Sequence, residues 1–193
     1  MTITKRAING RPTNPVGLGC MSLSWAYGVP PTDEDGAKLL HRALDLGYDH
    51  LDTARIYGLG HNETLIGKTL RDNRDKFFLA SKTGIIVDGE KRRIDCKPET
   101  ILREAEKSLK TLNVQHIDLY YMHRPDFSVP IEDSMGAMAQ LVGRANRMHA
   151  QLAQPDTTRR QSALYLFRVA VRKKRRREGA VYLLGQPKTH LRY

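Results

Sequence analysis

Four side chains able to hold or transfer protons stand at the ends of three short apolar segments. Asp52 and Tyr57 lie close together in DTARIYG, Lys82 lies in LASKTG, and His123 lies in YYMHRPD. A free phenol titrates at about 10, and the ammonium of a nearby lysine would favour its ionised form. A carboxylate would hold that lysine in place, and an imidazole could donate a hydrogen bond to a bound polar group. Together these residue types would suit proton transfer in a site from which water is largely excluded.

The elements that must position these residues alternate between short apolar runs and helical patterns. Such alternation is typical of βα units around a parallel sheet. The apolar runs that begin at Val16, His50, Phe77 and Ile117 predict four short strands. Their spacing is close to the roughly 30 residues expected of a βα repeat.

A helix is predicted after each strand. The first follows Thr32, which stands in a capping-box position, and ends before Gly47, where a left-handed residue is needed. The second begins near Asn62. The third begins at Pro98, because the first helical position needs no amide donor, and the fourth begins near Ile131.

The predicted topology brings the four candidate residues together. Parallel strands in a βα barrel deliver their carboxyl ends to one face, so Asp52, Tyr57, Lys82 and His123 should meet there. Each residue also has a plainer interpretation, as a turn cap, a half-buried aromatic, a solvated lysine or a packed histidine. Their equivalent positions at successive strand ends favour a shared chemical site.

The motifs that carry these residues resemble those of the aldo-keto reductases. The sequence contains D-T-A-x-x-Y-G, then N-E-x-L-I-G, then S-K-T, then D-L-Y-Y-x-H-x-P-D, in the order of that family. The resemblance covers residues 16–142. It implies part of a (β/α)8 TIM barrel, here about four βα units. It also implies NADPH or NADP as cofactor and the reversible reduction of an aldehyde or ketone to an alcohol.

The resemblance also assigns roles to the four residues. It implies that Tyr57 is the proton donor, that Lys82 assists it, that Asp52 holds Lys82, and that His123 orients the substrate carbonyl. The nicotinamide would supply the hydride. The expected partner is therefore a small carbonyl compound.

The cofactor would lie at the end of the first strand. By the same resemblance Gly19, Cys20 and Met21, together with Asp52, line the nicotinamide side of the cleft. The sequence GLGC lacks the full G-x-G-x-x-G pattern and does not predict a Rossmann fold. His61 and Glu63 are not spaced as zinc ligands, so no metal site is expected.

Residues 143–193 depart from the family pattern. The formal net charge of +11 belongs wholly to this Arg-rich tail, because the basic and acidic residues of 1–142 balance. We therefore expect two regions, 1–142 as the first half of a barrel and 143–193 as a basic, disordered or unrelated tail that adds no fifth βα unit. The family carries most of its NADPH contacts in later units, so an incomplete cofactor site and impaired activity are expected.

Several origins of the tail fit the sequence. Codon degeneracy allows VGRANR to be encoded by bases that spell EGQI in a shifted frame, close to a family segment at this point. A splice variant, a retained intron or a true extension are the alternatives. An open half barrel would leave strand edges unpaired and favour self-association.

A second function class is a non-catalytic fragment or binding protein whose basic tail contacts nucleic acid or an acidic partner. Residues 173–177 carry no interleaved aromatics, which weighs against nucleic-acid recognition. Two cysteines, no secretory signal pattern and no long apolar run predict a cytoplasmic protein without a membrane span. The sequence does not identify the substrate, whose specificity would depend in part on the variable stretch Ile85 to Arg93.

Overall fold

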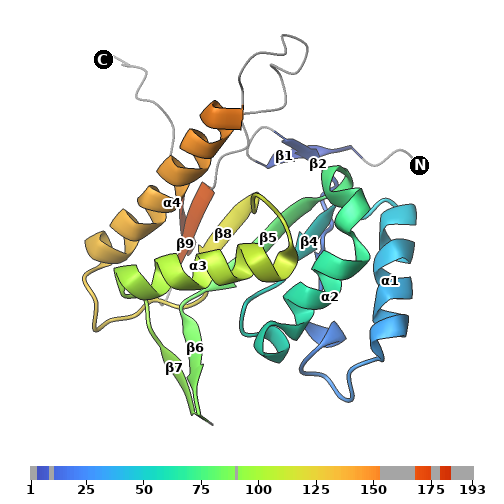
Figure 1. Cartoon of the computed structure of the whole chain (residues 1–193), viewed down its shortest axis with the longest axis horizontal. Coiled ribbons are helices and arrows are strands. Elements are labelled where there is room, and N and C mark those ends of the chain that lie inside the picture. Colours follow the sequence, from blue (N-terminus) through green and yellow to red (C-terminus); the bar gives the residue numbers. More distant parts are fainter. Residues whose placement is uncertain (1–3, 9–10, 90, 153–167, 175–178, 184–193) are drawn as a thin grey trace.

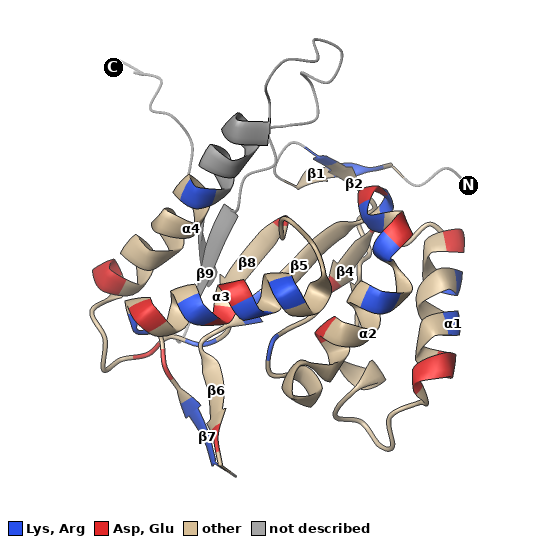
Figure 2. Ribbon diagram, viewed as in Figure 1, with Lys and Arg blue, Asp and Glu red and all other residues tan. Residues whose placement is uncertain are grey.

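A six-stranded sheet covered by helices forms the centre of the protein, in a computed structural model (Figure 1). The structure describes residues 4–8, 11–89, 91–152, 168–174 and 179–183, with side chains described up to residue 144. The strand order is β10-β9-β8-β5-β4-β3. Helices α1 to α4 lie along one face of this sheet (Figure 1), and their outward faces carry most of the charged residues of this layer (Figure 2).

The described strands are β1 (Arg6–Ile8), β2 (Arg11–Thr13), β3 (Leu18–Gly19), β4 (His50–Asp52), β5 (Phe78–Thr83), β6 (Ile85–Asp88), β7 (Lys91–Ile94), β8 (Leu119–Met122), β9 (Arg168–Lys174) and β10 (Gly179–Leu183). The described α-helices are α1 (Asp33–Asp45), α2 (His61–Thr69), α3 (Pro98–Leu112) and α4 (Ile131–Leu152). Three short 3-10 helices are η1 (Met21–Leu23), η2 (Tyr57–Gly60) and η3 (Arg71–Lys76).

The four predicted βα units are confirmed. Strands β3, β4, β5 and β8 pair in parallel, and each is followed by one of the helices α1 to α4. The register places Gly19 beside Asp52 and Lys82 beside Tyr121. The carboxyl ends of these strands therefore lie along one edge of the sheet, as a half barrel requires.

The helix boundaries follow the predicted caps. The Thr32 hydroxyl accepts a hydrogen bond from the Asp35 amide at 3.2 Å, so it caps α1. Gly47, just beyond that helix, has a φ of +87°. Pro98 is the first residue of α3, and Asn113 ends that helix in the left-handed region with a φ of +51°.

The structure differs from the prediction after Val142. Helix α4 continues to Leu152, and the backbone of β9 pairs in parallel with β8, while β10 pairs antiparallel with β9. We had expected no further βα unit in residues 143–193. The strand was not evident from the sequence, because Arg172, Lys173 and Lys174 are consecutive basic residues and break the alternation of apolar and polar positions.

Two hairpins were also not predicted. One joins β1 and β2, and the other joins β6 and β7 within the stretch Ile85 to Arg93 that we had treated as a variable loop. Their strands of three or four residues are too short for a clear alternation of apolar and polar residues, but the turns carry a hairpin signal that was missed, Asn-Gly at 9–10 and Asp-Gly at 88–89.

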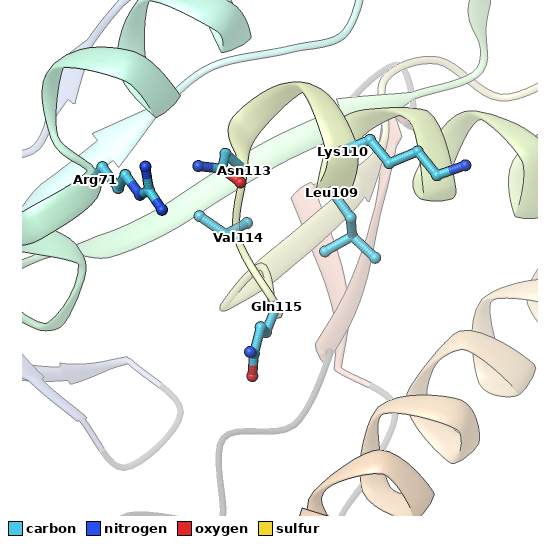
Figure 3. Close-up of a pocket in the computed structure, with 6 residues that line it drawn as sticks. All are labelled: Arg71, Leu109, Lys110, Asn113, Val114 and Gln115. Atoms are coloured by element: carbon cyan, nitrogen blue, oxygen red, sulfur yellow. The ribbon is translucent and has the colours of Figure 1, made fainter.

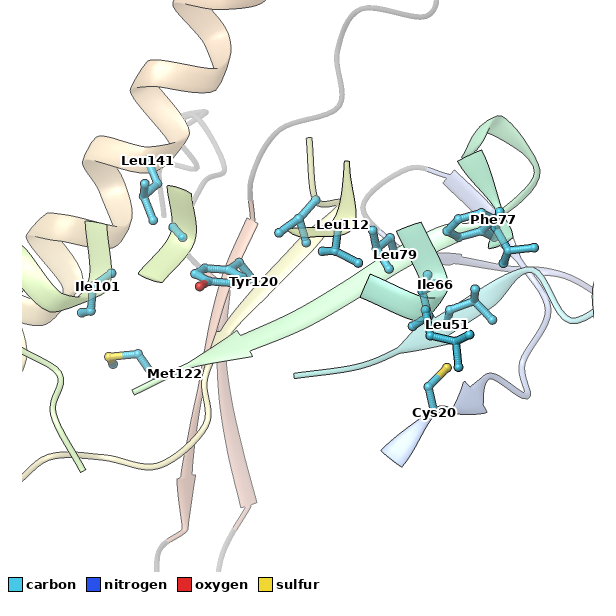
Figure 4. Close-up of a cluster of buried hydrophobic side chains, with 14 of the residues drawn as sticks. Cys20, Leu51, Ile66, Phe77, Leu79, Ile101, Leu112, Tyr120, Met122 and Leu141 are labelled. Atoms are coloured by element: carbon cyan, nitrogen blue, oxygen red, sulfur yellow. The ribbon is translucent and has the colours of Figure 1, made fainter. Parts of the chain in front are cut away.

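The main hydrophobic core lies between the sheet and the helices (Figure 4). Fully buried members come from the strands and from the inner faces of helices α1 to α4; they include Leu40, Leu51, Ile66, Leu79, Ile101, Leu112, Tyr120 and Met138. Burial of each such apolar side chain contributes about 1.5–3 kcal/mol to the free energy of folding. This core fixes α2 and α3 behind the strands whose ends carry the candidate site.

Gly67 allows α2 to approach the end of α3 closely. A Cβ added there would lie 2.4 Å from the carbonyl oxygen of Leu112, a backbone atom that cannot swing away. Gly67→Ala is therefore expected to lower the free energy of unfolding by about 1–3 kcal/mol in urea denaturation. Gly136→Ala in α4 is the control, since its Cβ meets nothing within 4 Å, and it should stabilise by about 0.5–1 kcal/mol. Equal effects of the two substitutions would contradict this packing.

Within the described ranges, no helix combines the length and the apolar character needed to cross a membrane.

Candidate active site

The structure brings the four predicted residues to one place. Asp52 is the last residue of β4, Lys82 is the last but one of β5, and His123 directly follows β8. Tyr57 opens η2 in the loop after β4. These strands are neighbours, so the sheet itself delivers all four side chains to its carboxyl edge.

The ammonium of Lys82 connects the other groups. It donates to the Asp52 carboxylate, to the Thr53 carbonyl oxygen at 2.9 Å and to the Tyr57 hydroxyl at 3.2 Å. These three contacts use all three ammonium donors. A positive charge is thereby fixed next to the phenolic oxygen, in a site where the Tyr57 side chain is only 7% exposed.

His123 also contacts the Tyr57 ring. The two rings meet edge to face, with centroids 5.9 Å apart and an interplanar angle of 83°. The His123 amide donates to the Thr83 carbonyl at 2.8 Å, which fixes its backbone to the end of β5. Burial, and then the positive charges of Lys82 and Arg124, lower the pKa of His123 to about 4. The imidazole is therefore neutral at pH 7 and has one ring N–H to donate.

The His123 pKa gives a pH prediction. The unfolded chain should bind this proton near pH 6.5, so the neutral ring contributes stability that is full above pH 6.5 and is lost as pH falls toward 4. In NMR spectra the ring nitrogen signals of His123 should shift at about pH 4 in the folded protein and near 6.5 in urea. Lys82→Met should raise the folded midpoint. A folded midpoint near 6.5 would contradict the burial and charge of this site.

Asn62 joins the ends of two strands behind the site. Its side chain is fully buried; its oxygen accepts from the Thr53 hydroxyl at 2.6 Å, and its nitrogen donates to the Cys20 carbonyl at 2.7 Å and to the Ser24 hydroxyl at 2.9 Å. Thr53 follows Asp52, and Cys20 follows β3. Asn62 therefore fixes the end of β4, which carries Asp52, to the segment predicted to line the cofactor.

Glu63, the next residue, also connects two segments behind the site. Its carboxylate is fully buried, accepts from the Ser81 hydroxyl at 2.8 Å and contacts Arg55 at 3.4 Å. Burial raises the pKa of Glu63, although hydrogen bonds from Ser81 and Ser108 and the charge of Arg55 act against the rise. Because Ser81 precedes Lys82, and Arg55 lies in the Tyr57 loop, Glu63 connects the lysine strand to the tyrosine loop.

Asn62 and Glu63 belong to the N-E-x-L-I-G motif, but their role in the site was not predicted from the sequence. The available signal was two polar residues beside the inward-facing positions of a short helix. The role of Trp25 was not predicted either. Its ring lies 6.1 Å from that of Tyr57 at an angle of 45°, and it extends the apolar wall formed by Met21, Ile85 and Val87 around Tyr57.

The three predicted cofactor residues have different surroundings. Gly19 pairs with Asp52 in the sheet, and a Cβ added to it would meet no atom within 4 Å, so its surface is open. Cys20 is fully buried, and burial raises the pKa of its thiol to about 12. Met21 packs near Tyr57. Gly19 and Met21 therefore border the site, whereas the Cys20 side chain belongs to the core.

A surface hollow of about 510 Å³ lies away from these residues (Figure 3). It is lined by Arg71, Leu109, Lys110, Asn113, Val114 and Gln115. These residues lie around the end of α3, where the chain leads into the start of β8. No predicted site residue lines it. Within the described ranges, no group of three or more His, Cys, Asp or Glu side chains is placed to hold a metal ion.

Comparison with known proteins agrees with the motifs and the fold. The model of the Aldo/keto reductase family matches residues 15–164, so the match extends beyond the limit at residue 142 drawn from the sequence. A probable aldo-keto reductase from Glycine max is 39% identical over 165 residues, which are 83% of this chain and 48% of the relative. The chain thus spans about half the length of that relative.

Two solved structures share the architecture. A glycerol dehydrogenase from Gluconobacter oxydans is 35% identical, with a TM-score of 0.66 over 74% of this chain and 45% of the other. An aldo/keto reductase from Klebsiella pneumoniae in complex with NADP and acetate is 26% identical, with a TM-score of 0.59 over 75% of this chain and 47% of the other. The motifs, the parallel sheet and these matches together show that the chain belongs to the aldo/keto reductase family.

Proposed function

We propose that this chain carries the catalytic half of an NADP-dependent oxidoreductase that reduces an aldehyde or ketone to an alcohol. The observation that carries the proposal is the hydrogen bond of 3.2 Å between the Lys82 ammonium and the Tyr57 hydroxyl, beside a neutral His123. A hydroxyl held by an ammonium at the mouth of a half barrel is suited to give up its proton. The family membership supports an oxidoreductase reaction.

Each residue would act at a defined atom. When bound, NADPH supplies the hydride, and negative charge then develops on the substrate oxygen. The Tyr57 hydroxyl donates its proton to that oxygen, and the His123 ring N–H donates a hydrogen bond that orients it. The Lys82 ammonium stabilises the phenolate left on Tyr57. The Asp52 carboxylate keeps Lys82 directed at the phenol.

The residues near the first strand are compatible with a nicotinamide. The open surface of Gly19 beside Asp52 offers room for a flat ring against the backbone, and the Klebsiella relative is described in complex with NADP. We propose that Gly19, Met21 and the Cys20 backbone face this ring. The remaining NADPH contacts would come from βα units outside the half represented here, so binding should be weaker than in longer relatives.

Three further predictions from the sequence remain proposals. They are the division into residues 1–142 and 143–193, a cytoplasmic location, and self-association through exposed strand edges. Among the described strands, β3 and β10 form the two edges of the sheet. Contact of the basic tail with nucleic acid or an acidic partner gains no support from the described residues and stays the weaker alternative.

The proposal is tested by titrating NADPH into the purified chain and then adding benzaldehyde. Saturable quenching of Trp25 fluorescence, followed by aldehyde-dependent loss of NADPH absorbance, is the expected result. Absence of saturable binding would rule out catalysis by this chain alone. Saturable binding without NADPH consumption for any tested aldehyde or ketone would also overturn the proposal.

A further inference from the structure

Arg92 lies at the outer end of a row of ring systems that begins at His123. Its guanidinium carbon is 4.0 Å from the centre of the Trp25 ring. Trp25 in turn lies against Tyr57, and Tyr57 lies against His123, with ring centres 6.1 and 5.9 Å apart. A group attached to a carbonyl between Tyr57 and His123 could therefore extend along Trp25 toward Arg92.

The β6–β7 hairpin turns Arg92 toward the site. Antiparallel pairing places Val87 opposite Arg92 and Ile85 opposite Ile94, so these four side chains share one face of the hairpin. Ile85 and Val87 pack against the cluster around Tyr57, which identifies this face as the one directed at the site. Lys91, paired with Asp88, belongs to the opposite face.

The charge of Arg92 is not neutralised by a neighbouring acid. Among the described residues, no carboxylate lies within 4.0 Å of its guanidinium, whereas the adjacent Arg93 pairs with Asp95 at 2.7 Å and with Asp88 at 4.0 Å. Arg93 therefore fixes the base of the hairpin. Arg92 stacks on an aromatic ring, which orients a guanidinium while leaving its N–H donors free for an anion.

We propose that Arg92 is a specificity-determining residue, and that the site selects carbonyl compounds that carry a carboxylate at the end remote from the carbonyl. This inference rests on the proposed reductase function and deepens it. With the carbonyl oxygen at Tyr57 and His123, the apolar middle of the substrate packs on Trp25, Ile85 and Val87. The remote carboxylate then accepts charge-assisted hydrogen bonds from Arg92.

The kinetic test compares 4-carboxybenzaldehyde with benzaldehyde, two substrates with the same ring and carbonyl, of which only the first carries a carboxylate at the remote end. Arg92→Gln is expected to lower kcat/KM for 4-carboxybenzaldehyde about tenfold and to change that for benzaldehyde less than twofold. Arg92→Lys keeps the charge and should restore part of the preference. Lys91→Ala removes the same charge from the opposite face and should change neither value.

A purely structural role for Arg92 gives a different result. If Arg92 only clamps the hairpin onto Trp25, Arg92→Gln should slow both substrates equally, and Arg92→Lys should not restore a preference for the anion. That outcome would overturn the inference. Equal kcat/KM for the two aldehydes in the wild-type chain would overturn it as well, while leaving the reductase function intact.

A binding measurement separates this inference from the proposed function. Trp25 is the single tryptophan of the chain, so intrinsic tryptophan fluorescence reports directly on the Arg92 contact. Titration with 4-(hydroxymethyl)benzoate should change this signal at roughly tenfold lower concentration than titration with benzyl alcohol, and Arg92→Gln should remove the difference. If neither aldehyde is reduced but this difference is present, the reductase proposal fails and the anion site stands. If the two ligands change the fluorescence at the same concentration, the proposed anion site is wrong.

Discussion

Replacing Tyr57 by phenylalanine is expected to abolish carbonyl reduction and to leave the affinity for NADPH nearly unchanged. The substitution removes only the hydroxyl that Lys82 contacts at 3.2 Å, and the ring can keep its edge-to-face contact with His123. Loss of a positioned proton donor typically costs about 10²–10⁴ in rate. The measurement is NADPH consumption with benzaldehyde at saturating cofactor, together with a fluorescence titration of NADPH.

Tyr27→Phe is the matched control for this prediction. Tyr27 lies in the loop between β3 and α1 and is 87% exposed, so removal of its hydroxyl should leave both the rate and the NADPH affinity unchanged. If Tyr57→Phe retains most of the activity, Tyr57 is not the proton donor. If activity and NADPH affinity fall together, the acid has been misplaced and Tyr57 belongs to the cofactor site.

Replacing Asp118 by alanine is expected to lower the free energy of unfolding by about 3–5 kcal/mol. The Asp118 carboxylate is 1% exposed, pairs with Arg74 at 2.6 Å and accepts from the Leu79 amide at 2.8 Å. Without it, the partly buried Arg74 would lose its charged partner at the amino end of β5 and β8. Urea denaturation at pH 7 measures the loss.

The pH dependence of that difference checks its electrostatic origin. Burial alone would raise the pKa of Asp118, but hydrogen bonding to His116 and the charge of Arg74 outweigh it and lower the pKa to about 2. The ionic part of the contribution is present above the unfolded value of 3.8 and is lost as pH falls toward 2, so the difference between wild type and variant should narrow there. Asp88→Ala, at an 80% exposed carboxylate, should change stability by less than about 0.5 kcal/mol. A constant difference across this range would contradict the ionic origin.

The helices were predictable because local chemistry decides their ends. Thr32, Gly47, Pro98 and Asn113 each satisfy or terminate a helix by a rule that needs no tertiary context. The hairpin of β6 and β7 also carries a local signal, Asp-Gly at positions 88–89, but its strands are four residues long and β7 is mostly basic. Strand β9 was not predictable in the same way, because it pairs with β8, which lies far from it in the sequence.

The meeting of Asp52, Tyr57, Lys82 and His123 was predictable from topology, since parallel strands present their ends on one edge. The supporting residues were not. Asn62 and Glu63 are polar residues whose partners, Thr53 and Ser81, lie on other elements, so only the packing of α2 against the sheet reveals them. The sequence places Asn62 and Glu63 beside the inward-facing positions of a short helix, but it does not identify their hydrogen-bond partners.

The proposed reaction requires that Tyr57 supplies a proton and NADPH supplies a hydride to the same carbonyl group. This is tested by incubating the wild-type chain with benzaldehyde and with NADPH that carries deuterium in the transferable position, followed by mass spectrometry of the alcohol. We expect one deuterium on the carbinol carbon of every product molecule, and no such product with Tyr57→Phe. Alcohol without deuterium, or deuterated alcohol formed equally well by the variant, would contradict it.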